Sequence, residues 1–481
     1  MTITKGVGRL LTAGAFLGAI AGCSANAPSG QTSGWSRTDL KPVSQPVALG
    51  GTFVLYVAAH GGLDLIGLDP HSGRTLWQDV ASPSVITPGV APELLVLGDH
   101  VIYPKLVSGQ EARMVAADAR TGHQVWQTAP AAFTSWPEAC PGDAQNICTT
   151  GVLASNPQQA QLLRFSGSTG TSLTSPVISA SGAGARELTP GLFDPGQRNP
   201  ELLLAASGPS VAWTKPLASI VSLPGASTDN GWNLDRIARV GLFVGSISGA
   251  PTDPNSDHPT FDLSNASTVG IGISDGSVAW QDPGSYFDCS LLPCPGGAGA
   301  GSSGSGAGAS LGPSVGVRTR ETGTLTAPSS TSGSPVVSPG ATVTVEGFDP
   351  ASGHTLWTFN AGDDTSLITQ EALPPQVGAS TIVLPNSAGQ PTTLDLATGA
   401  TEPAGAATVA WCQSATSYNE KVPYQSGNRS ISEYSGGYAV FPCDVASHAV
   451  GTPSRIPTFI GARIGGIAAW AQKNEVAASS I

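Results

Sequence analysis

The sequence predicts an all-β protein built as a single closed β-propeller of four-stranded blades, with eight blades favoured and seven possible. Gly and Pro are abundant, at 61 and 39 of 481 residues, which disfavours long helices and permits many turns. A turn motif recurs with a period of about 50 residues, as expected for propeller blades. Short apolar runs, such as residues 53–57 and 342–345, precede the motif and are predicted to be strands.

The N-terminal 44 residues are predicted to export and anchor the chain. Two basic residues precede an uncharged apolar run over residues 10–22, which has the length of a signal peptide and is too short to span a bilayer. The run ends in Ile-Ala-Gly before Cys23, which resembles a bacterial lipoprotein box. We expect residues 1–22 to be a signal peptide, Cys23 to carry diacylglycerol and palmitate, and residues 23–44 to be a flexible tether. The alternative is an ordinary secretory signal with a chance cysteine.

The six other cysteines are predicted to form disulfide bonds, because an exported protein lies in an oxidising compartment. Pairing of sequence neighbours is the simplest of the fifteen possible connectivities. It joins Cys140 to Cys148, Cys289 to Cys294, and Cys412 to Cys443. The alternative is that some remain free thiols. No pair has CxxC spacing, which disfavours zinc and a redox dithiol.

The turn motif reads Asp, then Ser or Thr three residues on, Gly four on and Trp eight on. The Asp carboxylate can accept hydrogen bonds from the next backbone amides, and Gly supplies the positive φ of a tight turn. Trp then lies on the following strand, so one copy is strand, turn, strand. Three copies are complete: Asp69, Gly73 and Trp77; Asp118, Gly122 and Trp126; and Asp349, Gly353 and Trp357.

Weaker copies and an insertion fill the rest of the chain. Gly276 with Trp280 and Asp395 with Gly399 keep parts of the motif, as do residues 166–170 and 444–448, and residues 202–213 are a candidate for part of another copy. A Gly/Ser-rich run at about 289–314 is predicted to be a flexible surface insertion, with a domain linker as the alternative. The propeller is expected to span residues 45–476. To close the ring, residues 459–470 should pair with strands near 46–58.

The motif resembles the PQQ-like, or quinoprotein-type, propeller repeat over about residues 45–470. Together with the lipoprotein box, it makes the chain similar to lipid-anchored propellers of the BamB-like kind. The resemblance implies that the repeated Trp residues dock between blades and are structural. It also raises PQQ-dependent dehydrogenases as an alternative. Several of these carry adjacent cysteines against the cofactor, and this chain has none, nor do their calcium ligands or catalytic Asp match positions here.

Other signals for chemistry are weak. A net charge of −12 argues against nucleic-acid binding. Residues 253–257 resemble the opening of a calcium loop, but His258 and Ser264 stand where that loop needs Gly and Glu, so an acidic turn is expected. Nothing pairs a nucleophile with a base. We therefore predict no catalytic residues, no metal and no cofactor, with PQQ and calcium as alternatives.

These observations favour a non-enzymatic scaffold, a monomer anchored outside the cytoplasm to the cell membrane, with other envelope proteins as partners. The alternative is a small-ligand-binding or PQQ-dependent oxidoreductase-like propeller that uses the central channel. The Arg, Ala, Gly and Pro bias is typical of a GC-rich, actinobacteria-like genome. Such an organism need not have an outer-membrane assembly machine, so that role is not carried over from the resemblance.

Overall fold

The computed structural model describes residues 34–480 apart from short internal segments, and this part is almost entirely β-structure, as the all-β class predicts. The described residues contain one short α-helix, α1 (Ser366–Thr369), and the 3-10 helices η1 (Leu217–Ser219), η2 (Thr228–Asn230) and η3 (Ala238–Val240). None of these helices is long and apolar enough to cross a membrane. The segments left out are 60–61, 83, 85–93, 110, 141–142, 154–159, 174–185, 190, 197–199, 208–209, 255, 288–291, 293–313, 328–334, 364–365, 370–373, 406–407, 415–418, 423–431, 436–438, 446–460 and 473.

Four antiparallel sheets follow along the chain, and in three of them strands that are consecutive in sequence lie side by side; in the third sheet, the first two strands both pair with the next one. The first contains β2 (Val47–Leu49), β3 (Thr52–Ala59), β4 (Gly62–Leu68) and β5 (Thr75–Ala81). The second contains β6 (Leu95–Leu97), β7 (His100–Ser108), β8 (Glu111–Asp118) and β9 (Gln124–Gln127). The third contains β10 (Ala132–Phe133), β11 (Glu138–Cys140), β12 (Asp143–Val152), β13 (Ala160–Ser166) and β14 (Ser172–Leu173). The fourth contains β15 (Arg186–Thr189), β16 (Leu192–Asp194), β17 (Leu202–Ser207) and β18 (Ser210–Pro216).

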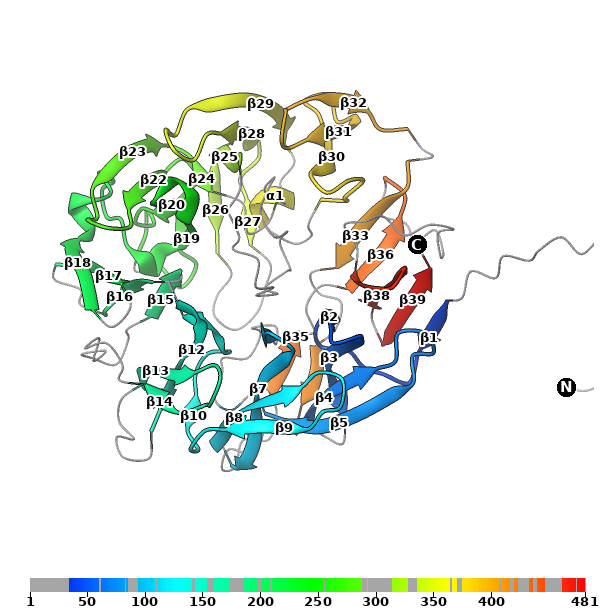
Figure 1. Ribbon diagram of the computed structural model, residues 1–481. Helices are drawn as coiled ribbons and strands as arrows, with labels where there is room; N and C mark the ends of the chain where they lie inside the picture. Colours follow the sequence, from blue (N-terminus) through cyan, green and yellow to red (C-terminus); the bar gives the residue numbers. More distant parts are fainter. Residues whose placement is uncertain are drawn as a thin grey trace, which may run out of the picture.

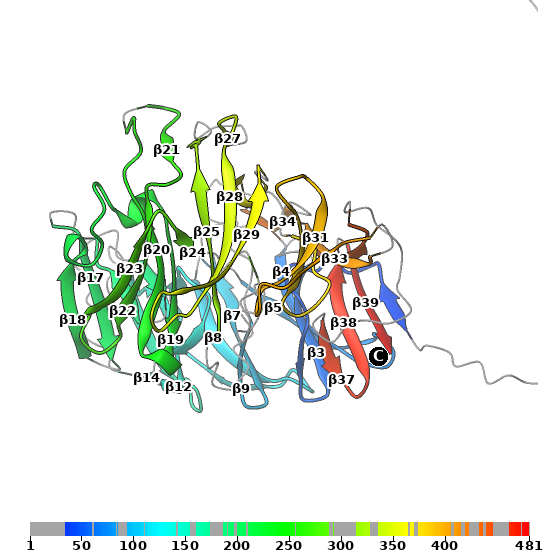
Figure 2. The same ribbon diagram turned by 90° about the horizontal axis from the view of Figure 1, so that it is seen from above.

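The next sheets carry insertions between their strands. One contains β19 (Trp232–Ile237), β20 (Leu242–Ser248), β22 (Ala266–Gly272) and β23 (Val278–Pro283), and its neighbour contains β24 (Tyr286–Phe287), β25 (Gly316–Thr322), β28 (Thr342–Phe348) and β29 (Thr355–Gly362). Their inserted segments form a separate sheet of β21 (Thr260–Asp262), β26 (Thr324–Thr326) and β27 (Val336–Val337). Figure 2 shows β21 and β27 extending beyond the strand ends on one face of the molecule.

The last third of the chain is less regular. A three-stranded sheet contains β30 (Thr381–Pro385), β31 (Pro391–Asp395) and β32 (Thr401–Pro403). Two hairpin-like pairs follow, β33 (Ala410–Ser414) with β36 (Ala439–Cys443) and β34 (Asn419–Val422) with β35 (Ser432–Ser435). The final sheet contains β37 (Ala462–Ile464), β38 (Ile467–Gln472), β39 (Glu475–Ser480) and, from the N-terminal end, β1 (Trp35–Arg37).

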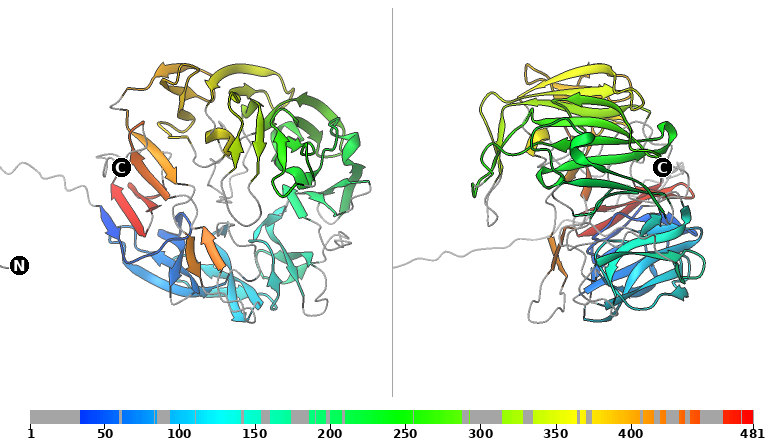
Figure 3. Two further views of the ribbon diagram at one scale, coloured as in Figure 1. Left: turned by 180° about the vertical axis from the view of Figure 1, so that it is seen from behind. Right: turned by 90° about the vertical axis from the view of Figure 1, so that its left-hand side faces the viewer.

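The sheets follow one another in chain order around a common centre (Figure 1). The two ends of the described chain meet, because Trp35 pairs with Ala478 and Arg37 with Val476. Figure 3 shows this from behind, with the blue β1 beside the red C-terminal strands. β1 lies within residues 23–44, which we predicted to be a tether, so regular structure begins by residue 35.

The predicted pairing of residues 459–470 with strands near 46–58 is wrong for the described part of that segment. β38 pairs with β37 and β39, and β39 pairs with β1. The sheet of β2–β5 instead packs against the C-terminal sheet face to face, through one apolar cluster that includes Phe53 and Ile467. The Gln45 amide also bonds both ways to the backbone of Ala471, at 2.9 and 3.2 Å. The prediction failed because the strand that pairs with the edge of the C-terminal sheet comes from residues 35–37, and not from residues 46–58.

The core consists of layers between adjacent sheets. Along β3, Phe53 and Leu55 face the C-terminal sheet, while Val54 and Tyr56 face the sheet of β6–β9. Strand side chains alternate between the two faces of a sheet, so a strand buried on both faces is continuously apolar. The same rule explains why β3 carries an unbroken apolar run and not an alternating one.

Candidate functional site

The repeat turns form compact hydrogen-bonded loops on the surface. At the first, Asp69 Oδ1 accepts the backbone N–H groups of His71 and Ser72, at 3.0 and 2.8 Å, and Gly73 N–H donates to the Asp69 carbonyl at 2.8 Å. Gly73 has φ +66°, a conformation that glycine adopts without strain. The hydrogen bond from Ser72 lowers the pKa of Asp69. These turns are therefore stable local structures with an ionised carboxylate engaged in the turn.

A tryptophan ring from the preceding sheet also packs directly on each turn glycine. A Cβ on Gly122 would lie 2.7 Å from the indole of Trp77, and Trp77 Nε1 donates to the Ala119 carbonyl at 2.8 Å. Only a residue without a side chain permits this contact. The same contact recurs for Trp35 on Gly73, Trp126 on Gly170, Trp213 on Gly276, Trp280 on Gly353 and Trp357 on Gly399. In the described chain, these tryptophans link one sheet to the next.

Sequence reasoning missed two of these tryptophans. Trp35 precedes every turn motif and reaches its place only because β1 joins the C-terminal sheet; its Nε1 donates to the Pro70 carbonyl at 2.7 Å. Trp213 lies at the end of residues 202–213, the predicted partial copy, and its Nε1 donates to the Ile273 carbonyl at 3.0 Å. No complete turn motif directly precedes Trp213 in the sequence, so the spacing alone could not assign it.

Two of the three predicted disulfides are present. Cys140–Cys148 joins β11 to β12, and Cys412–Cys443 joins β33 to β36. The Cys289 and Cys294 pair, Cys23 and most of the predicted insertion at 289–314 lie outside the described residues.

A buried ion network connects the two sheets that carry insertions. Arg318, 1% exposed, donates to Glu346 at 2.8 Å and lies 2.9 Å from Asp282. Arg320 bonds the same two carboxylates at 2.7 and 2.6 Å. The Arg318 guanidinium also stacks 4.8 Å from the Phe348 ring. Every charge in this group has a partner, so we assign the network to packing of the two sheets.

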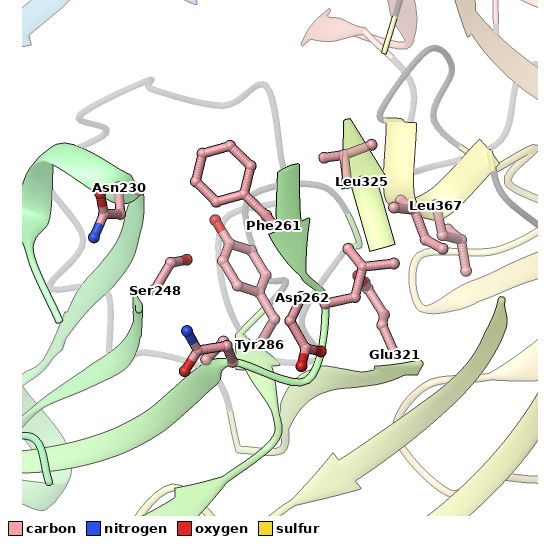
Figure 4. A pocket seen from close by; sticks show the side chains of 13 residues that line it. Asn230, Ser248, Phe261, Asp262, Tyr286, Glu321, Leu325 and Leu367 are labelled. Carbon is pink, nitrogen blue, oxygen red and sulfur yellow. The ribbon is translucent and has the colours of Figure 1, made fainter. Parts of the chain in front are cut away.

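A cavity of about 200 Å³ opens where the inserted sheet meets β20, β24 and β25. In Figure 4, Asn230 and Ser248 lie on one side and Leu325 and Leu367 on the other, with Phe261 and Tyr286 between them. Its wall consists of Asn230, Gly231, Ser248, Phe261, Asp262, Leu263, Asn265, Ala266, Tyr286, Glu321, Leu325, Leu367 and Ile368. None of the predicted site residues lies in this wall, because its members come from separate insertions that carry no repeat signal.

Glu321 is the most perturbed group of the cavity wall. Burial raises its pKa to about 7, and a hydrogen bond from Thr319 Oγ1 to Glu321 Oε1, at 2.8 Å, acts in the opposite direction. Asp262 Oδ1, in contrast, accepts the N–H and hydroxyl of Ser264 at 2.9 and 2.7 Å. The cavity thus combines one shielded carboxyl with one that its own turn satisfies.

The cavity wall does not fit PQQ. That cofactor is a tricarboxylate, and a site for it needs cationic partners. No Lys, Arg or His is present among the described residues of the wall, and its two ionisable carboxyls would repel an anion. Among the described residues, no group of three His, Cys, Asp or Glu side chains is arranged to hold a metal. At the predicted acidic turn, Asp253 Oδ1 accepts the N–H of Thr260 at 2.6 Å; Asn255 lies outside the described residues.

Comparison with known proteins finds a family model that matches part of the chain. Residues 23–190 match the family described as outer membrane protein assembly factor BamB. No curated protein sequence matches the chain. Three solved structures show similarity: BamB from Moraxella catarrhalis (12% identity, 93% of this chain and 98% of that one, TM-score 0.34), the quinohemoprotein alcohol dehydrogenase ADHIIG from Pseudomonas putida HK5 (11%, 80% and 71%, 0.38) and Sqt1 from Saccharomyces cerevisiae (9%, 85% and 98%, 0.39).

The structural likenesses are too distant to support any conclusion, and only the match to the family model bears on the predicted resemblance. It covers the two complete turn motifs at Gly73 and Gly122 and the weaker one at Gly170, each of which seats a tryptophan. The match agrees with the resemblance that these motifs predicted: residues 23–190 are similar to the PQQ-like β-propeller repeats of the BamB family.

Proposed function

We propose that the protein is a lipid-anchored, non-enzymatic scaffold of the cell envelope that binds other proteins through its propeller. The match to the BamB family supports an envelope location, and the two disulfides support an oxidising compartment. Cys23 would hold the chain at the membrane, outside the cytoplasm. The role in the family's description, outer membrane protein assembly, is not part of the proposal.

We further propose that the sheets form one closed ring of eight blades. The blades would be the four regular sheets, the two with insertions, the sheet of β30–β32 and the C-terminal sheet completed by β1. The indole of Trp35 on Gly73 supports closure, because it joins the final sheet to the first by the same contact that joins its neighbours. A ring held in this way is a rigid platform for partners.

The observation that carries the scaffold proposal is a repeated exposed apolar residue. Leu76, Val125 and Leu356 each directly precede a docked tryptophan, on the edge strands β5, β9 and β29, and are 39, 50 and 55% exposed. An edge strand with exposed apolar side chains is a surface to which another chain can add. These positions recur on different sheets around the molecule, whereas catalysis would require functional side chains that converge on one site.

Site-specific photocrosslinking in cells tests the scaffold proposal. A photoreactive residue at Leu76, Val125 or Leu356 should give discrete crosslinks to envelope proteins, while the exposed polar position Glu402 on β32 serves as the control. Absence of crosslinks from all three positions in a folded, membrane-associated protein would contradict the scaffold. In the same cells, Cys23→Ser should move the protein from the membrane to the soluble fraction if lipid holds it.

A further inference from the structure

The cavity between the inserted sheet and the sheets of β19–β23 and β24–β29 has no role in the scaffold proposal. It lies away from the repeat turns, and none of the docked tryptophans lines it. The pairing of Phe261 with Leu325 across β21 and β26 forms part of its wall, together with Leu367 and Ile368 of α1. The chain thus builds one side of the cavity entirely from segments that interrupt the repeat.

The size of the cavity limits what it can hold. A volume of about 200 Å³ is somewhat larger than the dry cavity of roughly 150 Å³ that accepts benzene in an engineered protein. It therefore accommodates one ring, or an aliphatic group of similar size, with a short polar substituent. Phe261, Leu325, Leu367 and Ile368 supply an apolar surface for such a group.

The charges in the wall define the polar end of the ligand. Among the described residues that line the cavity, Asp262 and Glu321 are the only charged side chains, and Tyr286 is the one other titratable group. The α1 and β26 walls contribute apolar side chains only. In the described chain, the Glu321 carboxylate accepts one hydrogen bond, from Thr319, and no cation pairs with it. A carboxylate shielded from water without a cationic partner favours binding of a positive charge.

We propose that this cavity binds a small organic cation, consisting of an apolar group of about six to eight carbon atoms that carries a protonated primary amine. The apolar group packs between Phe261 and Leu325, and the ammonium donates hydrogen bonds to the Glu321 carboxylate. An anion of the same shape is rejected by Asp262 and Glu321. A neutral analogue loses the charge-assisted hydrogen bond and binds more weakly.

Three probes of nearly equal shape separate these cases: benzylamine, benzyl alcohol and benzoate, titrated calorimetrically into the full-length protein at pH 8. We expect benzylammonium to bind at least about tenfold more tightly than benzyl alcohol, with no saturation by benzoate up to about 10 mM. At pH 5.5, where Glu321 is protonated, the advantage of benzylammonium should fall to within about threefold.

Point variants test which side chain causes the preference for benzylammonium over benzyl alcohol. Glu321→Gln should bring benzylammonium within about threefold of benzyl alcohol at pH 8, whereas the isosteric control Glu402→Gln, on β32, should retain the full preference. Asp262→Asn should have a smaller effect, because Ser264 already satisfies that carboxylate. Leu325→Trp should weaken binding of both probes by filling the cavity. Unchanged thermal transitions establish that each variant is folded.

Three results would overturn the inference: benzoate binding as tightly as benzylammonium, an unchanged preference in folded Glu321→Gln, or no binding of benzylammonium below about 10 mM. The site does not depend on the scaffold function. Loss of the crosslinks at the edge strands and loss of amine binding are separate outcomes, so either proposal can fail alone.

Discussion

The sheet of β2–β5 and the adjoining sheets of β19–β23 and β24–β29 have the same strand order and differ in what separates their strands. In the first, Ala59 pairs with Gly62 across a short link, and both faces are filled by apolar side chains. In the second region, β21, β26 and β27 lie between the strands of the two sheets and form one side of a cavity, while β23, β25 and β28 carry a buried ion network. The repeated sheets therefore build the framework and hold the ion network, and the inserted segments add the cavity.

The largest expected effect is in the region with insertions. Arg318→Met should lower the free energy of unfolding by about 3–5 kcal/mol, because Glu346 and Asp282 lose a buried partner. Denaturant unfolding measures it. Arg37→Met is a less buried control, because Arg37 pairs with the exposed Asp39 and donates to the Gly73 carbonyl at 2.6 Å, and it should cost about 1 kcal/mol. Equal losses would show that the buried network contributes no more than a surface ion pair.

Ring closure in the regular region gives the next effect. Trp35→Ala should lower the free energy of unfolding by about 3 kcal/mol, because it removes the indole that seats on Gly73 and leaves a cavity. Leu76→Ala, at an exposed position on the neighbouring β5, should change it by less than about 0.5 kcal/mol. Calorimetric unfolding compares the two. A loss for Trp35→Ala no larger than that control would indicate that the N-terminal strand does not stabilise the ring.

The cavity wall should show a pH dependence that the regular sheets lack. The pKa of Glu321 is raised to about 7 in the folded state, so the folded protein binds more protons than the unfolded chain between the unfolded pKa and pH 7. Stability contributed by the protonated form is therefore present at low pH and lost as the pH rises to 7 and above, by about 2 kcal/mol. Glu321→Gln should abolish this loss in unfolding curves recorded from pH 5 to 8. A pH dependence that persists in this variant would belong to another group.

The smallest expected effect concerns a single turn. Asp69→Ala should cost about 1 kcal/mol, because the N–H groups of His71 and Ser72 lose their acceptor while remaining exposed to water. Asp69→Asn keeps an acceptor oxygen and should cost less. Thermal unfolding of the two variants distinguishes them. Equal losses would mean that the carboxylate charge, and not the hydrogen bonds, stabilises the turn.

Much of the framework could be predicted from the sequence. Asp69, Gly73 and Trp77 reveal a turn because its hydrogen bonds and positive φ are local, and copies about 50 residues apart indicate blades. Residues 202–213 could be predicted only as a candidate for part of a copy, without a contact for Trp213. Its indole packs on Gly276 and donates to the Ile273 carbonyl, 60 residues later, so no local pattern could identify this contact. The cavity carries no signal, since Phe261, Glu321 and Leu367 are brought together by insertions of unrelated sequence.

The sequence by itself determined the all-β class, the spacing of the turns, the tryptophans of the complete motifs and the pairing of the cysteines that the structure describes. Each depends on interactions over a few residues or on a repeated pattern. The tertiary structure alone decided that Trp35 completes the final sheet, that Arg318 is buried among acids, and that Glu321 faces a cavity. These features depend on contacts between distant segments, whose geometry is set by packing of whole sheets and leaves no trace in the order of neighbouring residues.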